Sequence, residues 1–307
     1  MENPREEPNL FESSRLKIDP DLNLDHVVGQ DEAVKYLRTL VKKIEHSDVF
    51  ALWGLNKPKA VALTGPPGTG KSHALRAVAN ESKCPLVELK YEDFASHLYD
   101  DTVQRLAKFK EYAEMLSEEY GHILIFIDEA DVFFQSRFDV NTHSSDNKKT
   151  TFFLRWIDGD LEGSRNFTFL VTSNAWDSID PAMRRPGRFV EIPFKPLTEG
   201  DIRKCFGVHL NNLSRKLARS LSTFSVDLDE PFTFLSGNLP KELTGADVKE
   251  CLDRILAEKA LKFLDRRTKD SQAELCDEDL ISEEDVMTAV YEIGEKYTKN
   301  RRSVGFQ

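Results

Sequence analysis

Residues 65–72 read GPPGTGKS and satisfy the phosphate-binding pattern G-x-x-x-x-G-K-[ST]. The glycines permit backbone conformations that a Cβ would forbid, so successive N–H groups can converge on phosphate oxygens. Lys71 would reach the β- and γ-phosphates of a nucleoside triphosphate, and Ser72 would be a ligand of Mg²⁺. A glycine turn without a ligand is the alternative. The apolar run before the motif and the helical pattern after it favour phosphate binding.

Two adjacent carboxylates, Asp128 and Glu129, follow the apolar run ILIFI at 123–127. Carboxylates at the carboxyl end of a strand in a parallel sheet lie at the rim where ligands bind, beside the phosphate loop. Asp128 suits the coordination shell of Mg²⁺, and Glu129 suits a general base that orients and deprotonates an attacking water. A solvated acidic turn is the alternative. The occurrence of this carboxylate pair together with a phosphate-binding motif favours the chemical role.

Apolar runs alternate with helical spacings over residues 30–172. Runs typical of buried strands lie at 60–64, 85–89, 123–127 and 167–172, and helical spacings lie at 30–46, 72–80 and 102–119. Strands that alternate with helices predict a parallel sheet with helices on both faces. The expected fold class is α/β, with a P-loop NTPase body followed by an all-helical lid.

The sequence changes character twice along its length. Residues 1–22 are polar and are expected to form an N-terminal tail. After Pro196 no buried-strand run remains, and helical patterns begin at Thr198, where Asp201 stands in capping-box position. Further helical patterns cover 244–263 and 282–296. We therefore predict an α/β nucleotide-binding body over 23–197 and a helical lid over 198–307.

Composition and charge exclude several classes of protein. Lys and Arg total 42 against 53 Asp and Glu, a net charge of −11, which argues against general nucleic-acid binding because phosphate neutralisation needs surplus cations. The four cysteines form no C-x-x-C pair, so we expect free thiols in a reducing compartment. No apolar stretch approaches the roughly 20 residues that cross a bilayer, and the acidic N-terminus does not resemble a secretory signal. These features predict a cytoplasmic protein without a membrane segment.

The order of the motifs resembles that of the AAA family of ATPases, part of the wider AAA+ group, from about residue 25 to at least residue 289. The markers are VGQ at 28–30, GPPGTGKS at 65–72, IFIDEAD at 125–131, TSN at 172–174 and IDPAMRRPGRF at 179–189. The last segment resembles the family's second region of homology and is more specific than a phosphate loop alone. The resemblance implies ATP and Mg²⁺ as cofactors and ATP hydrolysis as the reaction.

The resemblance also assigns roles to residues at matching positions. Asn174 corresponds to a polar residue near the γ-phosphate and the attacking water; an asparagine that only caps a strand is the alternative. Arg185 and Arg188 correspond to arginines that reach across a subunit interface, whereas Arg184 is expected to form an ion pair within its own subunit. The implied catalytic residues are Lys71, Glu129, Asn174, Arg185 and Arg188. The implied nucleotide ligands are Val28, Gly29, Pro67, Gly68, Thr69, Gly70, Lys71, Ser72, His73, Gly245 and Ala246, and the implied Mg²⁺ ligands are Ser72 and Asp128.

The segment TGAD, Thr244 to Asp247, resembles the opening of the family's lid helix. Gly245 and Ala246 would there allow close approach to the nucleotide. Thr244 also fits a helix N-cap with Asp247 completing a capping box, and both interpretations can hold together.

Two segments depart from the family pattern. Many members that thread a substrate carry an aromatic–hydrophobic–glycine triplet after the second strand, but residues 94–101 contain no glycine. Tyr99 is the candidate for a side chain that grips an extended polypeptide in the pore, or it packs against the following helix. The polar segment Gln135 to Thr151 fits either a second pore loop or a mobile surface loop.

The function implied is Mg²⁺-dependent ATP hydrolysis that drives conformational change in a homo-oligomeric ring, a hexamer by resemblance. Such a ring would remodel, unfold or disassemble a protein client, and a separately encoded protease or adaptor is a possible partner. Two alternatives stay open. One is an AAA+ motor or clamp-loader-type ATPase that acts on nucleic acid. The other is a nucleotide-gated scaffold that hydrolyses ATP slowly.

Overall fold

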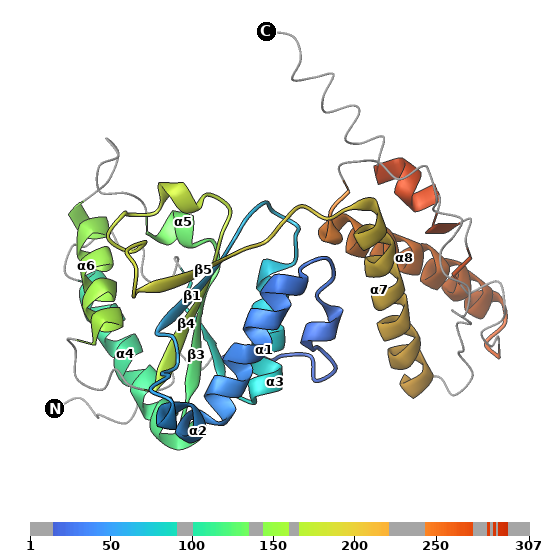
Figure 1. Ribbon diagram of the computed structural model, residues 1–307. Helices are drawn as coiled ribbons and strands as arrows, with labels where there is room; N and C mark the ends of the chain where they lie inside the picture. The colour runs from blue at the N-terminus through green and yellow to red at the C-terminus, as the bar shows by residue number, and fades with distance from the viewer. Residues whose placement is uncertain are drawn as a thin grey trace, which may run out of the picture. The chain divides into compact units, whose positions relative to one another are not determined.

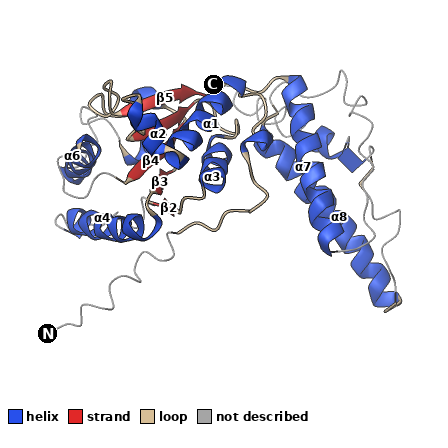
Figure 2. Cartoon of the chain, turned by 60° about the horizontal axis from the view of Figure 1, so that its bottom comes forward, coloured by secondary structure: helices blue, strands red, loops and turns tan. Residues whose placement is uncertain are grey.

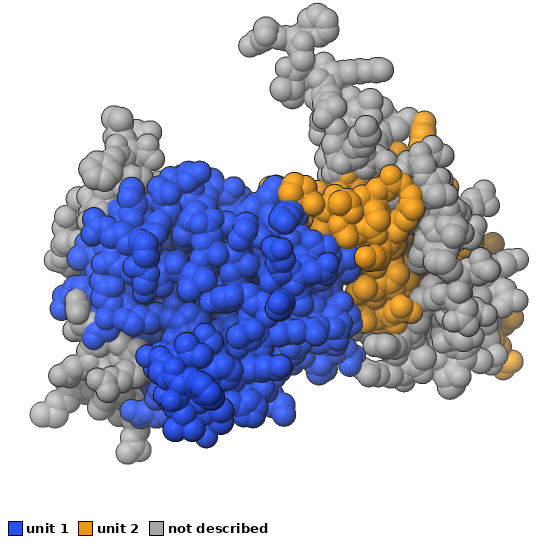
Figure 3. Space-filling view, viewed as in Figure 1, with its two compact units in different colours: residues 1–66, 71–195 blue, residues 67–70, 196–307 orange. Residues whose placement is uncertain are grey.

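The computed structural model describes residues 15–90, 101–134, 144–159, 166–220, 243–272, 281–282, 285–286 and 288–293 (Figure 1). The candidate pore residue Tyr99 lies outside these residues. The chain divides into two compact units (Figure 3). One contains residues 1–66 and 71–195, and the other contains residues 67–70 and 196–307.

The first unit is built on a five-stranded parallel sheet in the order β2-β3-β4-β1-β5. The strands are β1 (Ala60–Thr64), β2 (Leu86–Glu88), β3 (Ile123–Ile127), β4 (Phe167–Ser173) and β5 (Phe189–Pro193). Every residue of β1, β3 and β4 is buried, which explains why these strands are continuous apolar runs rather than alternating ones. The predicted parallel sheet is confirmed.

Helices cover both faces of the sheet, as predicted (Figure 2). Along β3, Ile123, Ile125 and Ile127 face one cluster, and Leu124 and Phe126 face the other. On the first face lie α4 (Asp101–Tyr120), the short α5 (Ala130–Phe133) and α6 (Ser144–Asp158); on the second lie α1 (Asp31–Glu45) and α3 (Lys71–Ser82). A short helix, α2 (Ser47–Leu52), follows α1. The sheet is therefore the middle of three layers.

Helix α6 corrects one sequence-based prediction. We expected a loop over 135–151, but the chain is helical from Ser144, and Lys149 and Thr150 are 3% and 1% exposed. Phe153 and Trp156, one helical turn apart, are buried and pack against rings of the sheet such as Phe169. Burial of these rings stabilises a helix whose first turns are too polar to signal it. Residues 135–143 lie outside the described part of the chain.

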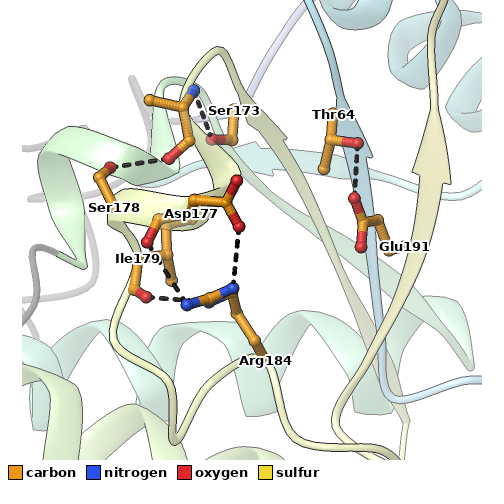
Figure 4. Close-up of polar contacts among 8 residues, drawn as sticks. Thr64, Ser173, Asp177, Ser178, Ile179, Arg184 and Glu191 are labelled. Atoms are coloured by element: carbon orange, nitrogen blue, oxygen red, sulfur yellow. Dashed lines mark hydrogen bonds and ion pairs between the residues drawn. The ribbon is translucent and has the colours of Figure 1, made fainter.

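Strand β5 was not predicted from the sequence. Among the described strands it pairs only with β1 and lies at the edge of the sheet, with Phe189 and Ile192 buried and Val190 and Glu191 exposed. A strand that is half exposed and ends in a proline lacks the continuous apolar run of a central strand. Thr64 donates a hydrogen bond to Glu191 at 3.0 Å and ties β5 to the end of β1 (Figure 4).

The described residues of the second unit are mainly helical, as expected for the lid. Helix α7 spans Glu199–Ser220 and α8 spans Gly245–Lys269, and residues 285–286 and 288–293 are also helical. The predicted caps are present, since Asp201 N–H donates to Thr198 Oγ1 at 3.2 Å and Thr244 forms a capping box with Asp247. Among the described helices, none has the length and apolar composition needed to cross a bilayer.

His122, immediately before β3, is 5% exposed and must be neutral in the folded protein. Its Nδ1 lies 3.3 Å from Lys57 Nζ, which can only donate, so Nε2 carries the proton and faces Thr168 Oγ1 at 3.2 Å. The Thr168 hydroxyl in turn donates to the Pro58 carbonyl at 3.0 Å. Burial, followed by the charge of Lys57, lowers the pKa of His122 to about 3.

This burial predicts a pH dependence of stability. Below about pH 6.5 His122 is protonated in the unfolded chain but stays neutral in the folded chain. The neutral histidine therefore contributes its full share of folding stability above that pH, and this contribution is lost as the pH falls. The free energy of unfolding should fall by up to about 1.4 kcal/mol per pH unit at this site between pH 6.5 and pH 5. Urea unfolding of wild type and His122→Gln at several pH values measures the difference. Parallel pH profiles would contradict the assignment.

Gly65 illustrates why the loop after β1 requires glycine. Its φ is +137°, and a Cβ there would overlap the carbonyl oxygen of Phe194. Gly65→Ala should therefore lower the free energy of unfolding by about 3 kcal/mol, from backbone strain plus overpacking. Gly54 is the matched control, since its φ is +69° but a Cβ added there would meet no atom within 4 Å. Gly54→Ala should cost about 1 kcal/mol. Equal losses in urea unfolding would show that the Phe194 contact has no effect.

Candidate active site

The candidate site residues of the first unit follow three neighbouring strands. β4 lies between β1 and β3 and is parallel to both. Segments that leave parallel strands at their carboxyl ends meet at one edge of the sheet. The phosphate loop follows β1, Asp128 and Glu129 follow β3, and Asn174 follows β4. The structure brings Lys71 of the phosphate loop into direct contact with Asn174, and Ser72 of the loop into contact with Asp128.

Lys71 begins α3 and is 6% exposed. Its ammonium group donates to the carbonyl oxygens of Gly65 and Pro66 at 2.6 and 2.7 Å and to Asn174 Oδ1 at 2.8 Å. These three acceptors match the three donors of an ammonium group. Burial lowers the pKa of Lys71, and the negative charge of Asp128 opposes this shift. The lysine is thus held as a cation at the base of the loop, beside Asn174.

Ser72 and Asp128 are suitably placed for one divalent cation. Ser72 Oγ donates to the Asp128 carboxylate at 3.0 Å (Oδ1) and 3.2 Å (Oδ2). Two adjacent ligands of an octahedral Mg²⁺ at about 2.1 Å are themselves roughly 3 Å apart, so the spacing fits. Within the described residues no three His, Cys, Asp or Glu side chains gather into a metal cluster. Mg²⁺ usually keeps several waters and is held by one or two protein ligands together with phosphate oxygens of the substrate.

Glu129 has an exposed side chain and an unusual backbone. Its φ and ψ are 50° and 53°, the left-handed region, and its carbonyl accepts the first hydrogen bond of α5 from Val132 at 2.8 Å. A left-handed conformation at a residue other than glycine costs of order 1–3 kcal/mol and persists only where the surroundings impose it. The structure thus places the candidate base on a constrained turn between β3 and α5.

Sequence reasoning gave no role to two residues that hold this turn. Thr172, 2% exposed, donates to Asp128 Oδ1 and accepts the Glu129 N–H at 3.1 Å. Asp131 accepts the backbone N–H of Asn174 at 3.1 Å. The sequence signal that could have identified Thr172 is a hydroxyl group in an otherwise apolar part of β4. Asp131 is the last residue of the IFIDEAD motif, but the motif did not assign it a role.

The three neighbouring arginines have different environments. Arg184 donates to Asp177 Oδ1 and to the Ile179 carbonyl, both at 3.1 Å, which confirms the predicted ion pair (Figure 4). Arg188 forms a bidentate pair with Asp158, at 2.9 Å from Nε and 2.6 Å from Nη2. Arg185 is exposed, and its guanidinium makes no hydrogen bond or ion pair with the described residues. The pairing of Arg188 with Asp158 was not anticipated.

The tip of the phosphate loop, residues 67–70, belongs to the second compact unit. There the N–H of Gly245, the first residue of α8, donates to the Gly68 carbonyl at 3.0 Å. A Cβ on Gly68 would lie 2.5 Å from Thr244 Oγ1, and a Cβ on Gly245 would lie 3.2 Å from the Gly68 oxygen. Both glycines therefore permit this close contact, next to the exposed Ala246.

The other predicted nucleotide ligands lie in the phosphate loop, in the first turn of α3 and just before α1. Thr69 is 4% exposed, and His73 is half-buried in the first turn of α3. Val28 and Gly29 are half-buried and precede α1, with φ of +74° at Gly29. Gln30, which had no predicted role, exchanges two hydrogen bonds with the backbone of Lys195, at 2.8 and 3.0 Å.

Comparison with known proteins agrees with this geometry. Residues 61–197 match the family described as "ATPase family associated with various cellular activities (AAA)". Similar proteins include Protein SAV of Sulfolobus acidocaldarius (33% identical; 86% of this chain, 31% of that protein) and the Cell division cycle protein 48 homolog of Archaeoglobus fulgidus (30%; 89% and 36%). The Proteasome-activating nucleotidase of Saccharolobus islandicus is 28% identical over 80% of this chain and 59% of its own length.

The chain thus spans about a third of the first two relatives, at 31% and 36% of their lengths. The matched region contains the phosphate loop, both carboxylates, Asn174 and the arginines on one parallel sheet. On this evidence residues 61–197 of the chain form a domain of the AAA family of ATPases.

Proposed function

We propose that the protein is a Mg²⁺-dependent ATPase that uses hydrolysis to change its own conformation and thereby remodels a protein client. The observation that carries this proposal is the convergence of Lys71, Asn174, Ser72 and Asp128 at one edge of the sheet. Lys71 lies within hydrogen-bonding distance of Asn174, and Ser72 lies within hydrogen-bonding distance of Asp128. A cation beside a neutral amide, together with a pair of metal-binding oxygens, suits a bound triphosphate better than a purely structural role.

Each residue then has a distinct task. The backbone N–H groups of the loop and the ammonium group of Lys71 would hold the phosphates, and Asn174 would orient the attacking water. Glu129, exposed at the strand tip, would accept a proton from that water. Mg²⁺ bound at Ser72 and Asp128 would neutralise charge on the phosphate oxygens.

The loop tip offers a route from nucleotide to movement. Because Gly68 is hydrogen-bonded to the first residue of α8, rearrangement of the loop on nucleotide binding would be transmitted directly to that helix. The lid over 198–307 would then move relative to the body over 23–197 as nucleotide binds and is hydrolysed. Val28, Gly29, Gly245 and Ala246 would contact the base and sugar.

We further propose a homo-oligomeric ring, a hexamer, in which Arg185 completes the site of the next subunit. Its guanidinium is exposed and has no hydrogen bond or ion pair among the described residues, which suits this role better than Arg188, which Asp158 holds within its own chain. A guanidinium from a neighbour stabilises charge in the transition state and makes turnover depend on assembly. A protein client, and a separate protease or adaptor in the cytoplasm, fit a chain similar to a protein named Proteasome-activating nucleotidase.

An AAA+ motor or clamp loader for nucleic acid is the second candidate function. The net charge of −11 disfavours it, because cationic surplus is the electrostatic basis of phosphate-backbone binding. Turnover that rises severalfold when DNA or RNA is added would favour it. A slowly hydrolysing scaffold would instead bind ATP and release phosphate only slowly.

The role of Glu129 is tested by Glu129→Gln, which keeps the shape of the side chain and removes the base. Turnover should fall at least about 100-fold, while ATP affinity changes less than about threefold. Phosphate release and equilibrium binding of ATP measure the two effects. Glu119→Gln, at an exposed glutamate near the end of α4, is the control and should retain full turnover. Hydrolysis that survives Glu129→Gln would refute the assignment.

The trans-acting role is tested by Arg185→Ala. Turnover should fall about 10³-fold with nucleotide still bound, because the transition-state contact is lost. Mixing this variant with Glu129→Gln subunits, whose arginine is intact, should restore part of the activity. Failure of every mixing ratio to restore turnover would exclude a contribution across subunits. Arg188→Ala provides the comparison, since loss of the Asp158 pair should also lower the thermal midpoint, whereas loss of Arg185 should not.

A further inference from the structure

Thr172 occupies an unusual position for a buried threonine. It lies near the end of β4, opposite Leu63 of β1, and is 2% exposed. A β-branched residue is a normal choice for a central strand, and burial alone would be satisfied equally by valine. The hydroxyl group therefore requires a separate explanation.

That hydroxyl contacts both carboxylate-bearing residues of the site. Oγ1 donates its single proton to Asp128 Oδ1, which leaves its lone pairs to accept the Glu129 N–H at 3.1 Å. One side chain thus fixes the rotamer of the candidate metal ligand and the orientation of the peptide that carries the candidate base. The second contact also explains how Glu129 can keep its left-handed conformation, with φ of 50°.

Thr172 contacts Asp128 from outside the expected coordination shell. Among the described residues, Asp128 accepts hydrogen bonds from two hydroxyl groups, that of Ser72 at 3.0 Å and that of Thr172. A serine that coordinates Mg²⁺ directs an oxygen lone pair to the metal and can still donate its proton to Asp128. Thr172 would orient the Asp128 carboxylate without being a metal ligand itself.

We infer that Thr172 is a positioning residue that sets the geometry of Asp128 and Glu129 for Mg²⁺ binding and hydrolysis. The inference rests on the proposed ATPase function and adds a residue to it. Hydrogen-bond partners of metal ligands commonly change metal affinity or activity by about 10- to 100-fold when removed.

The test compares Thr172→Val, which keeps the shape and removes both hydrogen bonds, with Thr172→Ser, which keeps the hydroxyl. The matched control is Thr168→Val on the same strand, where the lost hydroxyl is also buried but donates to the Pro58 carbonyl, before the start of β1. Thermal midpoints separate general loss of stability from an effect on the site. If Thr172→Val does not fold, Thr172→Ala removes the same hydroxyl group and places only a methyl group at this position.

Two measurements carry the result. In ATP hydrolysis, Thr172→Val should lower kcat about 10- to 100-fold and raise the Mg²⁺ concentration for half-maximal rate about 10-fold, with KM for ATP within about threefold. In calorimetry with a non-hydrolysable ATP analogue, it should lose most of the affinity gained on replacing EDTA with Mg²⁺. Thr172→Ser should restore both properties to within about threefold of wild type, and Thr168→Val should change neither.

A folded Thr172→Val with wild-type kcat and Mg²⁺ dependence would overturn the inference and leave the proposed ATPase function intact. So would equal deficits in Thr172→Val and Thr172→Ser, or a matching deficit in Thr168→Val. A wild-type protein that neither binds the Mg²⁺–nucleotide nor hydrolyses ATP would overturn the proposed function itself, and the inference with it.

Discussion

The parallel hydrogen-bonded register of β1, β4 and β3 is the constraint on which the rest of this structure depends. Because the three strands are adjacent and run the same way, residues separated by 103 positions in the sequence, Lys71 and Asn174, come within 2.8 Å. The burial of both sheet faces holds that register, since a shift by one residue would exchange the side chains packed under α4 and α6 with those packed under α1 and α3.

Around this edge of the sheet, polar groups of the chain satisfy one another's hydrogen-bonding capacity. The ammonium group of Lys71 is satisfied by three oxygens, and Asp128 by two hydroxyl groups. Because Lys71 is buried, an ammonium group left half-paired there would be costly, so the network favours one arrangement of the side chains. An incoming triphosphate would replace partners rather than create the site, which is the physical meaning of a preorganised centre.

Glycines and arginines that look equivalent in the sequence have different environments in the structure. Gly65 avoids an overlap with Phe194, whereas Gly68 allows the close approach of Thr244 and Gly245. Arg184 and Arg188 are bound to Asp177 and Asp158, whereas Arg185 is exposed. Among the described residues, Arg184 and Arg188 thus form ion pairs within the chain, whereas the Arg185 guanidinium forms none.

Local pattern determined much of this protein by itself. Four of the five strands, the helices α1, α3 and α4, the caps at Thr198 and Thr244, and the chemistry of the phosphate loop follow from periodicity and motif spacing, because those signals lie within a few residues of one another. Tertiary structure alone decided the rest. The edge strand β5 and the polar start of α6 are stabilised by partners distant in sequence. The contacts of Thr172 with Asp128 and Glu129 and of Arg188 with Asp158 arise only when distant segments become neighbours, which no local pattern records.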